Sequence, residues 1–271
     1  MAKTITTGFI SDNINGIKVN KSLPCHSSNY QSKVSRKIAY IVMHYTGNEK
    51  DTARANANYF RGRNRKASAH FFVDNDNIYQ VVALKNVAWH CGGSTYYHSA
   101  CRNSNALGIE MCCTAGNYKI SNKTLENSAY LCANLCKRVG IKATDVDKYV
   151  LRHYDVTHKK CPAQYANSAN DPDWIAFKKM VKNILNTGKA TASEAKPVRK
   201  DEEVKTKYKV RVTATALNIR KGPGATYSKV GVIKDQGIYT IVKEKNKWGL
   251  LKSGAEKEDM WISLVYTKEV K

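Results

Sequence analysis

The sequence predicts an α/β domain with a central sheet and covering helices, followed by a small all-β barrel. Apolar runs alternate with amphipathic segments over residues 1–185, as strands alternate with helices. Residues 186–207 are small, charged and without any aromatic side chain, which is typical of a flexible linker. Residues 208–271 consist of short alternating runs separated by turns, a pattern that indicates a small barrel.

The first half of the α/β domain contains the clearest strand signals. The apolar run Ile38–Thr46 predicts a buried strand, and the helix after it begins behind the N-capping residues Asp51 and Thr52. Residues 69–82 alternate in a way that predicts a β-hairpin. Residues 106–113 form a second apolar run and predict another strand of the sheet.

Two amphipathic helices are predicted in the second half of this domain. Residues 124–140 end at Gly140, a helix-terminating residue, and carry one apolar face made of Leu125, Cys132, Leu135, Cys136 and Val139. Residues 173–185 form the last helix, which we expect Asp173 to cap.

The barrel is predicted from six short runs of alternating polarity. Gly222, Pro223 and Gly224 mark a sharp bend after the second of them. The runs are residues 208–214, 217–220, 229–234, 238–246, 247–252 and 260–266.

The chain is strongly basic, with 45 lysines and arginines against 22 acidic residues and a formal net charge of +23. Such a charge favours a polyanionic partner. A nucleic acid, a bacterial wall that carries teichoic acids and an anionic membrane surface all satisfy it, so charge alone does not select among them.

The cellular location is predicted from features that the sequence does not contain. No apolar run approaches the length of a membrane span, and residues 1–10 have no apolar segment typical of a secretion signal. We therefore expect synthesis in the cytoplasm without a signal peptide. With no secretion signal, the eight cysteines, of which Cys112 and Cys113 are adjacent, are expected to be reduced thiols rather than disulfides.

Three residues have the chemistry of a metal site. A catalytic zinc ion needs three His, Cys or carboxylate ligands and an open position. His44 lies near the end of a predicted strand, His153 follows the short apolar run 149–151, and Cys161 comes after the next turn. By spacing alone, buried structural histidines beside a buried thiol are the favoured interpretation.

Five motifs then identify a family. "YIVMHYTG", "SAHFFVDNDNIYQVV", "AWHCGG", "ALGIEMC" and "LRHYDVTHKKCP" occur in the order found in zinc-dependent N-acetylmuramoyl-L-alanine amidases of type 2. The resemblance covers about Ile38–Lys179. The family includes phage endolysin-like amidases and peptidoglycan recognition proteins. It implies a mixed central sheet with Zn²⁺ at its end, and cleavage of the amide between N-acetylmuramic acid and L-alanine.

The resemblance also implies roles for single residues. The zinc ligands are His44, His153 and Cys161, and the general base is Glu110 in "GIEMC". Some members of the family instead use a tyrosine just before the "HF" motif, but this chain has Ala69 there. Glu110 is therefore the expected base.

Other positions in these motifs remain open to two interpretations. Lys159 matches the lysine expected to stabilise the developing oxyanion, with the adjacent Lys160 as the alternative. His90 is expected to contact substrate, or else to be structural, and Trp89 to be packing. Cys91 suggests a cysteine nucleophile, but the sequence provides no specific base to activate it.

The C-terminal segment is similar to bacterial SH3-like domains. "LNIRKGPG", "VGVI", "KWGLLK" and "WISLVY" carry this resemblance over Tyr208–Tyr266. It implies a domain that holds the enzyme on the cell wall. Tyr227 and Trp248 are candidates for exposed aromatic contacts, whereas Trp261 is expected in the barrel core.

Together these observations predict a cell-wall hydrolase with an amidase domain (1–185), a linker (186–207) and a wall-binding domain (208–271). We expect a monomer whose partner is Gram-positive peptidoglycan, with no nucleic-acid partner and no transmembrane segment. Phage endolysins of this kind reach the wall through a membrane pore or after lysis, and a bacterial autolysin would also fit. The alternative is non-catalytic peptidoglycan recognition, against which the presence of the third ligand, Cys161, argues.

Overall fold

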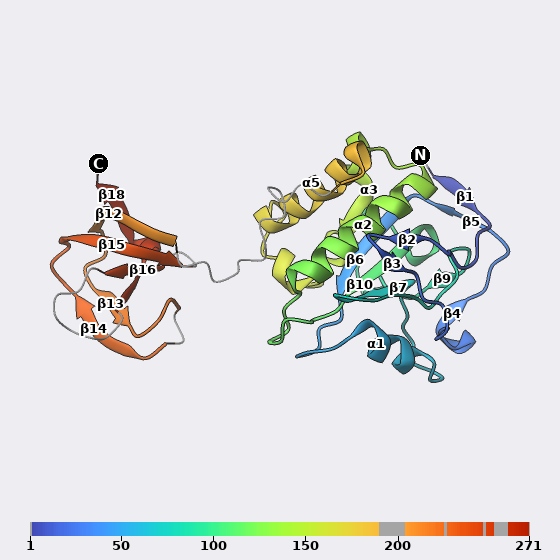
Figure 1. Cartoon of the computed structure of the whole chain (residues 1–271), viewed down its shortest axis with the longest axis horizontal. Coiled ribbons are helices and arrows are strands. Elements are labelled where there is room, and N and C mark those ends of the chain that lie inside the picture. The colour runs from blue at the N-terminus through green and yellow to red at the C-terminus, as the bar shows by residue number, and fades with distance from the viewer. Residues whose placement is uncertain (1, 190–203, 225–226, 246–247, 252–259, 271) are drawn as a thin grey trace. The chain divides into compact units, whose positions relative to one another are not determined.

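The computed structural model describes residues 2–189, 204–224, 227–245, 248–251 and 260–270 (Figure 1). It divides into two compact units, Met1–Val198 and Arg199–Lys271, which are described separately. Most of the predicted linker, 186–207, lies outside the described residues. Helix α5 extends to Thr187, and strand β12 begins at Val204.

A five-stranded sheet with the order β11-β6-β10-β7-β8 forms the centre of the first unit. Its four strands from β11 to β7 run parallel, and β8 pairs antiparallel with β7, so the sheet is mixed, as the family resemblance implied. The strands are β6 (Tyr40–Tyr45), β7 (Phe71–Val73), β8 (Ile78–Gln80), β10 (Ala106–Met111) and β11 (Val150–Arg152).

Two long helices, α2 (Asn122–Val139) and α5 (Pro172–Thr187), pack side by side over one face of this sheet (Figure 1). The apolar face predicted for α2 is entirely within the core, and Gly140 ends the helix in the left-handed conformation. The shorter helices are α1 (Ala53–Phe60), α3 (Val146–Tyr149) and α4 (His153–Thr157).

Helix α5 begins earlier than predicted. Its N-cap is Asp171, whose carboxylate accepts hydrogen bonds from the backbone N–H groups of Asp173 and Trp174. Pro172 occupies the first helical position, where its missing N–H costs no hydrogen bond. The predicted cap, Asp173, therefore lies inside the first turn. By contrast, Thr52 caps α1 as predicted.

Alternation along β6 and β10 gives the sheet two different faces. Ile41 and Met43 point into the core beneath α2 and α5, as do Ile109 and Met111 of β10. The residues between them point to the opposite face, where the core cluster is smaller and includes Tyr40, Val42, Cys91 and Ala106. This second face is free to carry polar side chains at the ends of its strands.

Short strand pairs and single helical turns complete the first unit. The pairs are β1 (Lys3–Ile5) with β5 (Arg36–Ile38), β2 (Asn13–Ile14) with β3 (Ile17–Lys18), and β4 (Tyr30–Gln31) with β9 (Val87–Ala88). The 3₁₀ turns are η1 (Ser27–Asn29), η2 (Asn103–Asn105), η3 (Ala143–Asp145) and η4 (Ala163–Tyr165).

The second unit is an antiparallel seven-stranded sheet with the order β14-β13-β17-β16-β15-β12-β18. Its core includes Ile241 and Ile262, and Trp261 is buried as predicted. The elements are β12 (Val204–Val212), β13 (Leu217–Arg220), β14 (Lys229–Ile233), β15 (Ile238–Lys245), β16 (Trp248–Leu251), β17 (Trp261–Ser263), η5 (Leu264–Tyr266) and β18 (Thr267–Val270).

The end of this unit differs from the prediction. The run 260–266 is not one strand, because β17 stops at Ser263 and a 3₁₀ turn follows. The turn leads the chain into β18, which pairs with β12 and was not predicted. Its sequence, Thr-Lys-Glu-Val, is polar and largely exposed, so it carries little strand signal.

Among the described residues, no helix has both the length and the apolar composition needed to cross a membrane.

Candidate metal centre and catalytic site

Three predicted ligands come together at one edge of the central sheet. His44 is the next-to-last residue of β6, and His153 directly follows the parallel strand β11. Because β6 and β11 run parallel, their carboxyl ends lie at the same edge. Cys161 reaches the same point from the loop after α4.

The geometry of these three side chains suits a small cation. One ligand atom from each of His44, His153 and Cys161 lies within 4.8 Å of the others, and all three residues are buried. Cys161 Sγ is 3.7 Å from His44 Nδ1, and the two imidazole ring centres are 4.9 Å apart. Two imidazoles and one thiolate leave a fourth tetrahedral position open, which is the arrangement of catalytic zinc sites.

Each histidine is oriented through the nitrogen that faces away from this cluster. His44 Nε2 lies 3.0 Å from His90 Nδ1, and His153 Nε2 lies 3.1 Å from the carbonyl oxygen of Gly92. A proton on each Nε2 satisfies these contacts and leaves both Nδ1 atoms as lone-pair donors to a metal.

Burial keeps the imidazoles neutral. It lowers the pKa of His153 to about 4 and holds the pKa of His44 well below its usual value. Burial also raises the pKa of the Cys161 thiol to about 12, so this thiol needs a nearby cation to ionise near neutral pH. Neutral imidazoles beside a thiol that requires a cation fit a divalent metal ion.

Glu110 lies beside the cluster on the same face of the sheet. It is the next-to-last residue of β10 and pairs in register with His44 of the parallel neighbour β6. Its Oε2 atom is buried and has no hydrogen-bond partner among the described residues. Burial raises the pKa of Glu110 to about 8, while the positive charge of Lys159 opposes this shift.

The two adjacent lysines differ in their electrostatic relation to the site. Lys159 is exposed, yet its charge acts on Glu110 and also lowers the pKa of Cys161. Lys160 is not among the groups that shift the pKa of either residue. This difference favours Lys159, the lysine that the motif register indicated.

The histidine expected to contact substrate lies beneath the cluster. His90 is only 8% exposed, its Nδ1 atom faces His44, and its Nε2 atom is 3.5 Å from the carbonyl oxygen of Ala106. Its ring also covers Gly108, where an added Cβ would lie 2.6 Å from the ring. This position suits a residue that orients His44.

The neighbouring Cys91 lies in the apolar cluster with Tyr40 and Val42, and it is fully buried. Its Sγ atom lies 3.3 Å from Asn103 Oδ1. A thiol enclosed in this way is inaccessible to a polymeric substrate, which argues against the cysteine-nucleophile alternative.

One positioning residue was not identified from the sequence. Arg152, 1% exposed, precedes the ligand His153 and forms an ion pair with Asp155 at 2.6 Å. Its Nη1 atom also donates to the backbone carbonyls of Tyr165 and Ser168, beyond Cys161. Arg152 thus ties the strand that carries one ligand to the loop that carries another. The Arg-x-x-Asp spacing was the available signal.

Comparison with known proteins agrees with this geometry. Residues 34–164 match the family model described as N-acetylmuramoyl-L-alanine amidase, and this range contains all three candidate ligands and Glu110.

Two relatives from Bacillus licheniformis are similar in sequence. A probable N-acetylmuramoyl-L-alanine amidase is 31% identical over 237 residues, which cover 79% of this chain and 63% of the relative. The N-acetylmuramoyl-L-alanine amidase CwlL is 32% identical over 163 residues, covering 57% of this chain and 43% of the relative. The chain therefore spans less than two thirds of the length of either relative.

Solved structures share the fold. A mutant endolysin from Bacillus subtilis is 26% identical with a TM-score of 0.50, covering 61% of this chain and 99% of that one. The PlyG catalytic domain, at 24% identity and a TM-score of 0.51, covers 65% of this chain and 98% of its own. Sequence, fold and the convergent His-His-Cys group agree, and residues 34–164 of the first unit are thus similar to the N-acetylmuramoyl-L-alanine amidase family.

Proposed function

We propose that this protein is a zinc-dependent N-acetylmuramoyl-L-alanine amidase that hydrolyses the amide between N-acetylmuramic acid and L-alanine in peptidoglycan. One observation carries the proposal. The buried His44, His153 and Cys161 converge beside Glu110, within the segment that matches this family. Both Bacillus licheniformis relatives carry the name N-acetylmuramoyl-L-alanine amidase, which supports the proposal.

The donor set supports zinc as the metal. Borderline-soft Zn²⁺ is commonly held by imidazole and thiolate ligands, whereas Mg²⁺ and Ca²⁺ prefer oxygen. His44 and His153 would bind through Nδ1, and Cys161 through its thiolate. A zinc ion held there supplies Lewis acidity, which polarises the scissile carbonyl and makes water more acidic.

Glu110 is the proposed general base. Its unpartnered Oε2 atom is available to take a proton from the attacking water and to pass it to the leaving amine of alanine. Its pKa of about 8 lies close to neutral pH, and a group with such a pKa can both accept a proton and return it. Ala69 occupies the position of the tyrosine that some members of the family use instead, so Glu110 is the remaining candidate for the base.

Lys159 is proposed to stabilise the negative charge that develops on the carbonyl oxygen. Its charge already acts on Glu110 and Cys161, and its exposed position lets it approach a substrate in the site. His90, which is buried against His44, is proposed to orient the metal ligand.

The test is end-group analysis of purified Gram-positive peptidoglycan after digestion by the full chain, with and without a zinc chelator. New N-terminal alanine without new reducing sugar ends, abolished by chelation and restored by Zn²⁺, is the expected result. Tight wall binding without new ends would instead indicate peptidoglycan recognition. New ends that survive chelation would rule out the metal mechanism.

We also propose that the second unit is an SH3-like barrel that holds the enzyme on the wall. Its antiparallel sheet and its exposed aromatic residues, Tyr227 and Tyr266, support this role. A tethered binding unit raises the local concentration of the catalytic unit at a polymer. Co-sedimentation of the full chain with purified walls tests this proposal. Substitutions on the surface of the second unit should reduce wall binding, and unchanged binding would contradict the proposal.

A further inference from the structure

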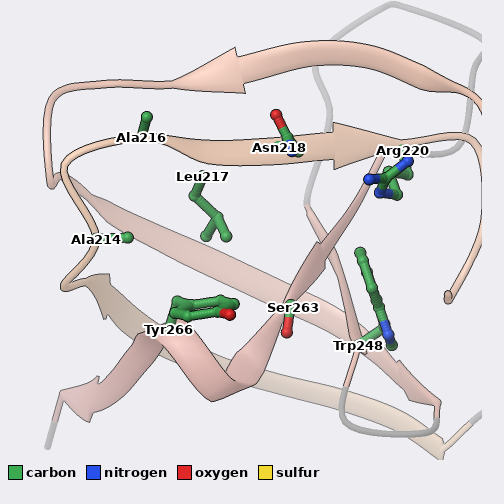
Figure 2. Close-up of a pocket in the computed structure, with 8 residues that line it drawn as sticks. All are labelled: Ala214, Ala216, Leu217, Asn218, Arg220, Trp248, Ser263 and Tyr266. Atoms are coloured by element: carbon green, nitrogen blue, oxygen red, sulfur yellow. The ribbon is translucent and has the colours of Figure 1, made fainter. Parts of the chain in front are cut away.

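The second unit contains a pocket of about 510 Å³ (Figure 2). The residues that line it are distant in sequence from the candidate metal ligands. It lies between strand β13, the start of β16 and the turn η5. Trp248 and Tyr266 lie on opposite sides of Ser263, and Arg220 lies next to Trp248 (Figure 2). The pocket therefore has two aromatic walls, a hydroxyl between them and a guanidinium at one end.

The rest of the lining is small or apolar. Leu217 is buried beneath the pocket, and Ala214 and Ala216 limit it on the side away from Arg220. Tyr266 is 53% exposed, so part of its ring is accessible to a ligand. Such aromatic walls beside small residues accept a narrow, largely uncharged ligand.

Arg220 has a hydrogen-bond donor that no described residue satisfies. Its Nη1 atom donates to the backbone carbonyl of Tyr227 at 2.8 Å, which fixes the guanidinium plane. Its Nε atom is buried and has no hydrogen-bond partner among the described residues. A buried donor without a partner is costly, because it has lost its hydration without replacement.

The Nε–Nη2 edge of a guanidinium matches the two oxygens of a carboxylate or phosphate. Arg220 is the only charged side chain among the described residues that line the pocket. A single cation in a mostly apolar pocket suits a ligand with one localised negative charge. A phosphodiester polymer would instead be bound by several basic side chains along the groove that it occupies.

We propose that this pocket binds the free carboxylate of a short peptide with small side chains. The carboxylate pairs with the Nε–Nη2 edge of Arg220, and the peptide lies between the rings of Trp248 and Tyr266. Asn218, exposed at the rim, and Ser263 provide polar contacts for peptide groups. The site is defined by its own chemistry and is independent of hydrolysis at the first unit.

The experiment compares two probes on the full chain by isothermal titration calorimetry. N-acetyl-trialanine with a free carboxylate is expected to bind at least about tenfold more tightly than the same peptide as its amide, because only the acid can form the charge-assisted pair. Arg220→Gln should remove this preference. Arg220→Lys should restore it only in part, because an ammonium group lacks the planar fork.

Arg211→Gln is the matched control, because Arg211 is exposed on β12 of the same unit and does not line the pocket. It should leave the preference for the acid unchanged. A measurement on the unaltered chain guards against misfolded variants. The indole N–H signal of Trp248, assigned with Trp248→Phe, should shift in NMR spectra with the acid and not with the amide.

Several results would overturn the proposal. These are equal affinity for acid and amide, an undisturbed Trp248 signal, and equal losses of the preference in Arg220→Gln and in the control Arg211→Gln. Tighter binding of poly(glycerol phosphate) or a muramyl saccharide than of the peptide would also overturn it. Failure of the amidase proposal would be recognised separately. Release of N-terminal alanine from soluble muramyl peptides reports on the metal centre proposed in the first unit, so its absence with the preference for the acid intact would contradict the amidase proposal only.

Discussion

His90 Nδ1 lies 3.0 Å from His44 Nε2, so two histidines that are 46 positions apart in sequence form one hydrogen-bonded pair at the metal centre. Their rings meet edge to face, with centres 5.1 Å apart. With the proton on His44 Nε2, His90 fixes both the tautomer and the ring orientation of the ligand. We therefore propose that His90 acts through His44 as a positioning residue.

Loss of this contact should weaken metal binding. His90→Ala removes the acceptor for His44 Nε2, and such outer contacts typically contribute about 10- to 100-fold in metal affinity. His90→Asn, which keeps a polar acceptor, should recover part of the loss. Competition with a chromophoric chelator measures the affinity, and an unchanged affinity in His90→Ala with reduced substrate binding would assign His90 to substrate contact instead.

A second substitution tests the same contact without altering either histidine. In Gly108→Ala the new Cβ would lie 2.6 Å from the His90 ring and would displace it. We expect weaker zinc binding and lower activity from this variant. Gly116→Ala is a poor control because Gly116 has φ +75°, whereas Gly8→Ala has open space around its Cβ and should leave both properties unchanged.

Cys161→Ser should lose zinc and wall lysis together. A hydroxyl ionises far less readily than a thiol and is a weak zinc ligand, so two imidazoles alone would hold the metal. Metal content after dialysis and turbidity loss of wall suspensions measure the two effects. Cys91→Ser, at a buried thiol outside the cluster, is the matched control, and an active Cys161→Ser protein without zinc would disprove the metal assignment.

Glu110→Gln should separate activity from stability. Loss of the general base should lower turnover by about 10²- to 10⁴-fold while zinc remains bound. The raised pKa of about 8 means that the folded state binds the Glu110 proton more tightly than the unfolded state does. Stability of the chelator-treated protein should therefore fall as pH rises from the ordinary carboxyl pKa through 8.

Glutamine carries no charge and avoids this loss. At pH 9 the variant should be more stable to unfolding than the unaltered chain by about 1–3 kcal/mol, whereas the two should be similar at pH 4. Urea unfolding at both pH values measures the difference. A variant that is less stable at pH 9 would mean that the Glu110 carboxylate makes a favourable contact in the folded protein.

Acid should destabilise the metal centre through its histidines. The pKa of His153 is lowered to about 4, so between pH 6.5 and 4 the unfolded state binds a proton that the folded state excludes. Stability of the chelator-treated chain is thus complete above pH 6.5 and declines as pH falls. Protons also compete with zinc, so metal release should begin in the same range. His153→Gln should flatten this pH dependence, which melting curves across the range can check.

The helices and the parallel strands were predictable because each carries its pattern locally. The α2 face from Leu125 to Val139 repeats with the helical period, and Gly140 and Thr52 supply end signals within one turn. Strand β18 was missed because its short polar sequence gains its pairing only from β12, about sixty residues earlier. The start of α5 was misplaced because Asp171 and Asp173 are equally good caps, and Pro172 favours the earlier one.

The sequence by itself determined which residues have the chemistry of the site: His44, His153, Cys161, Glu110 and Lys159 all come from motifs in a fixed order. It could not determine the contacts among them, because these depend on strands that meet only after folding. The parallel pairing of β6, β10 and β11 places Glu110 in register with His44 and sets His153 at the same edge. Tertiary structure alone decided that His90 faces His44, since a hydrogen bond between distant segments leaves no periodic trace in either one.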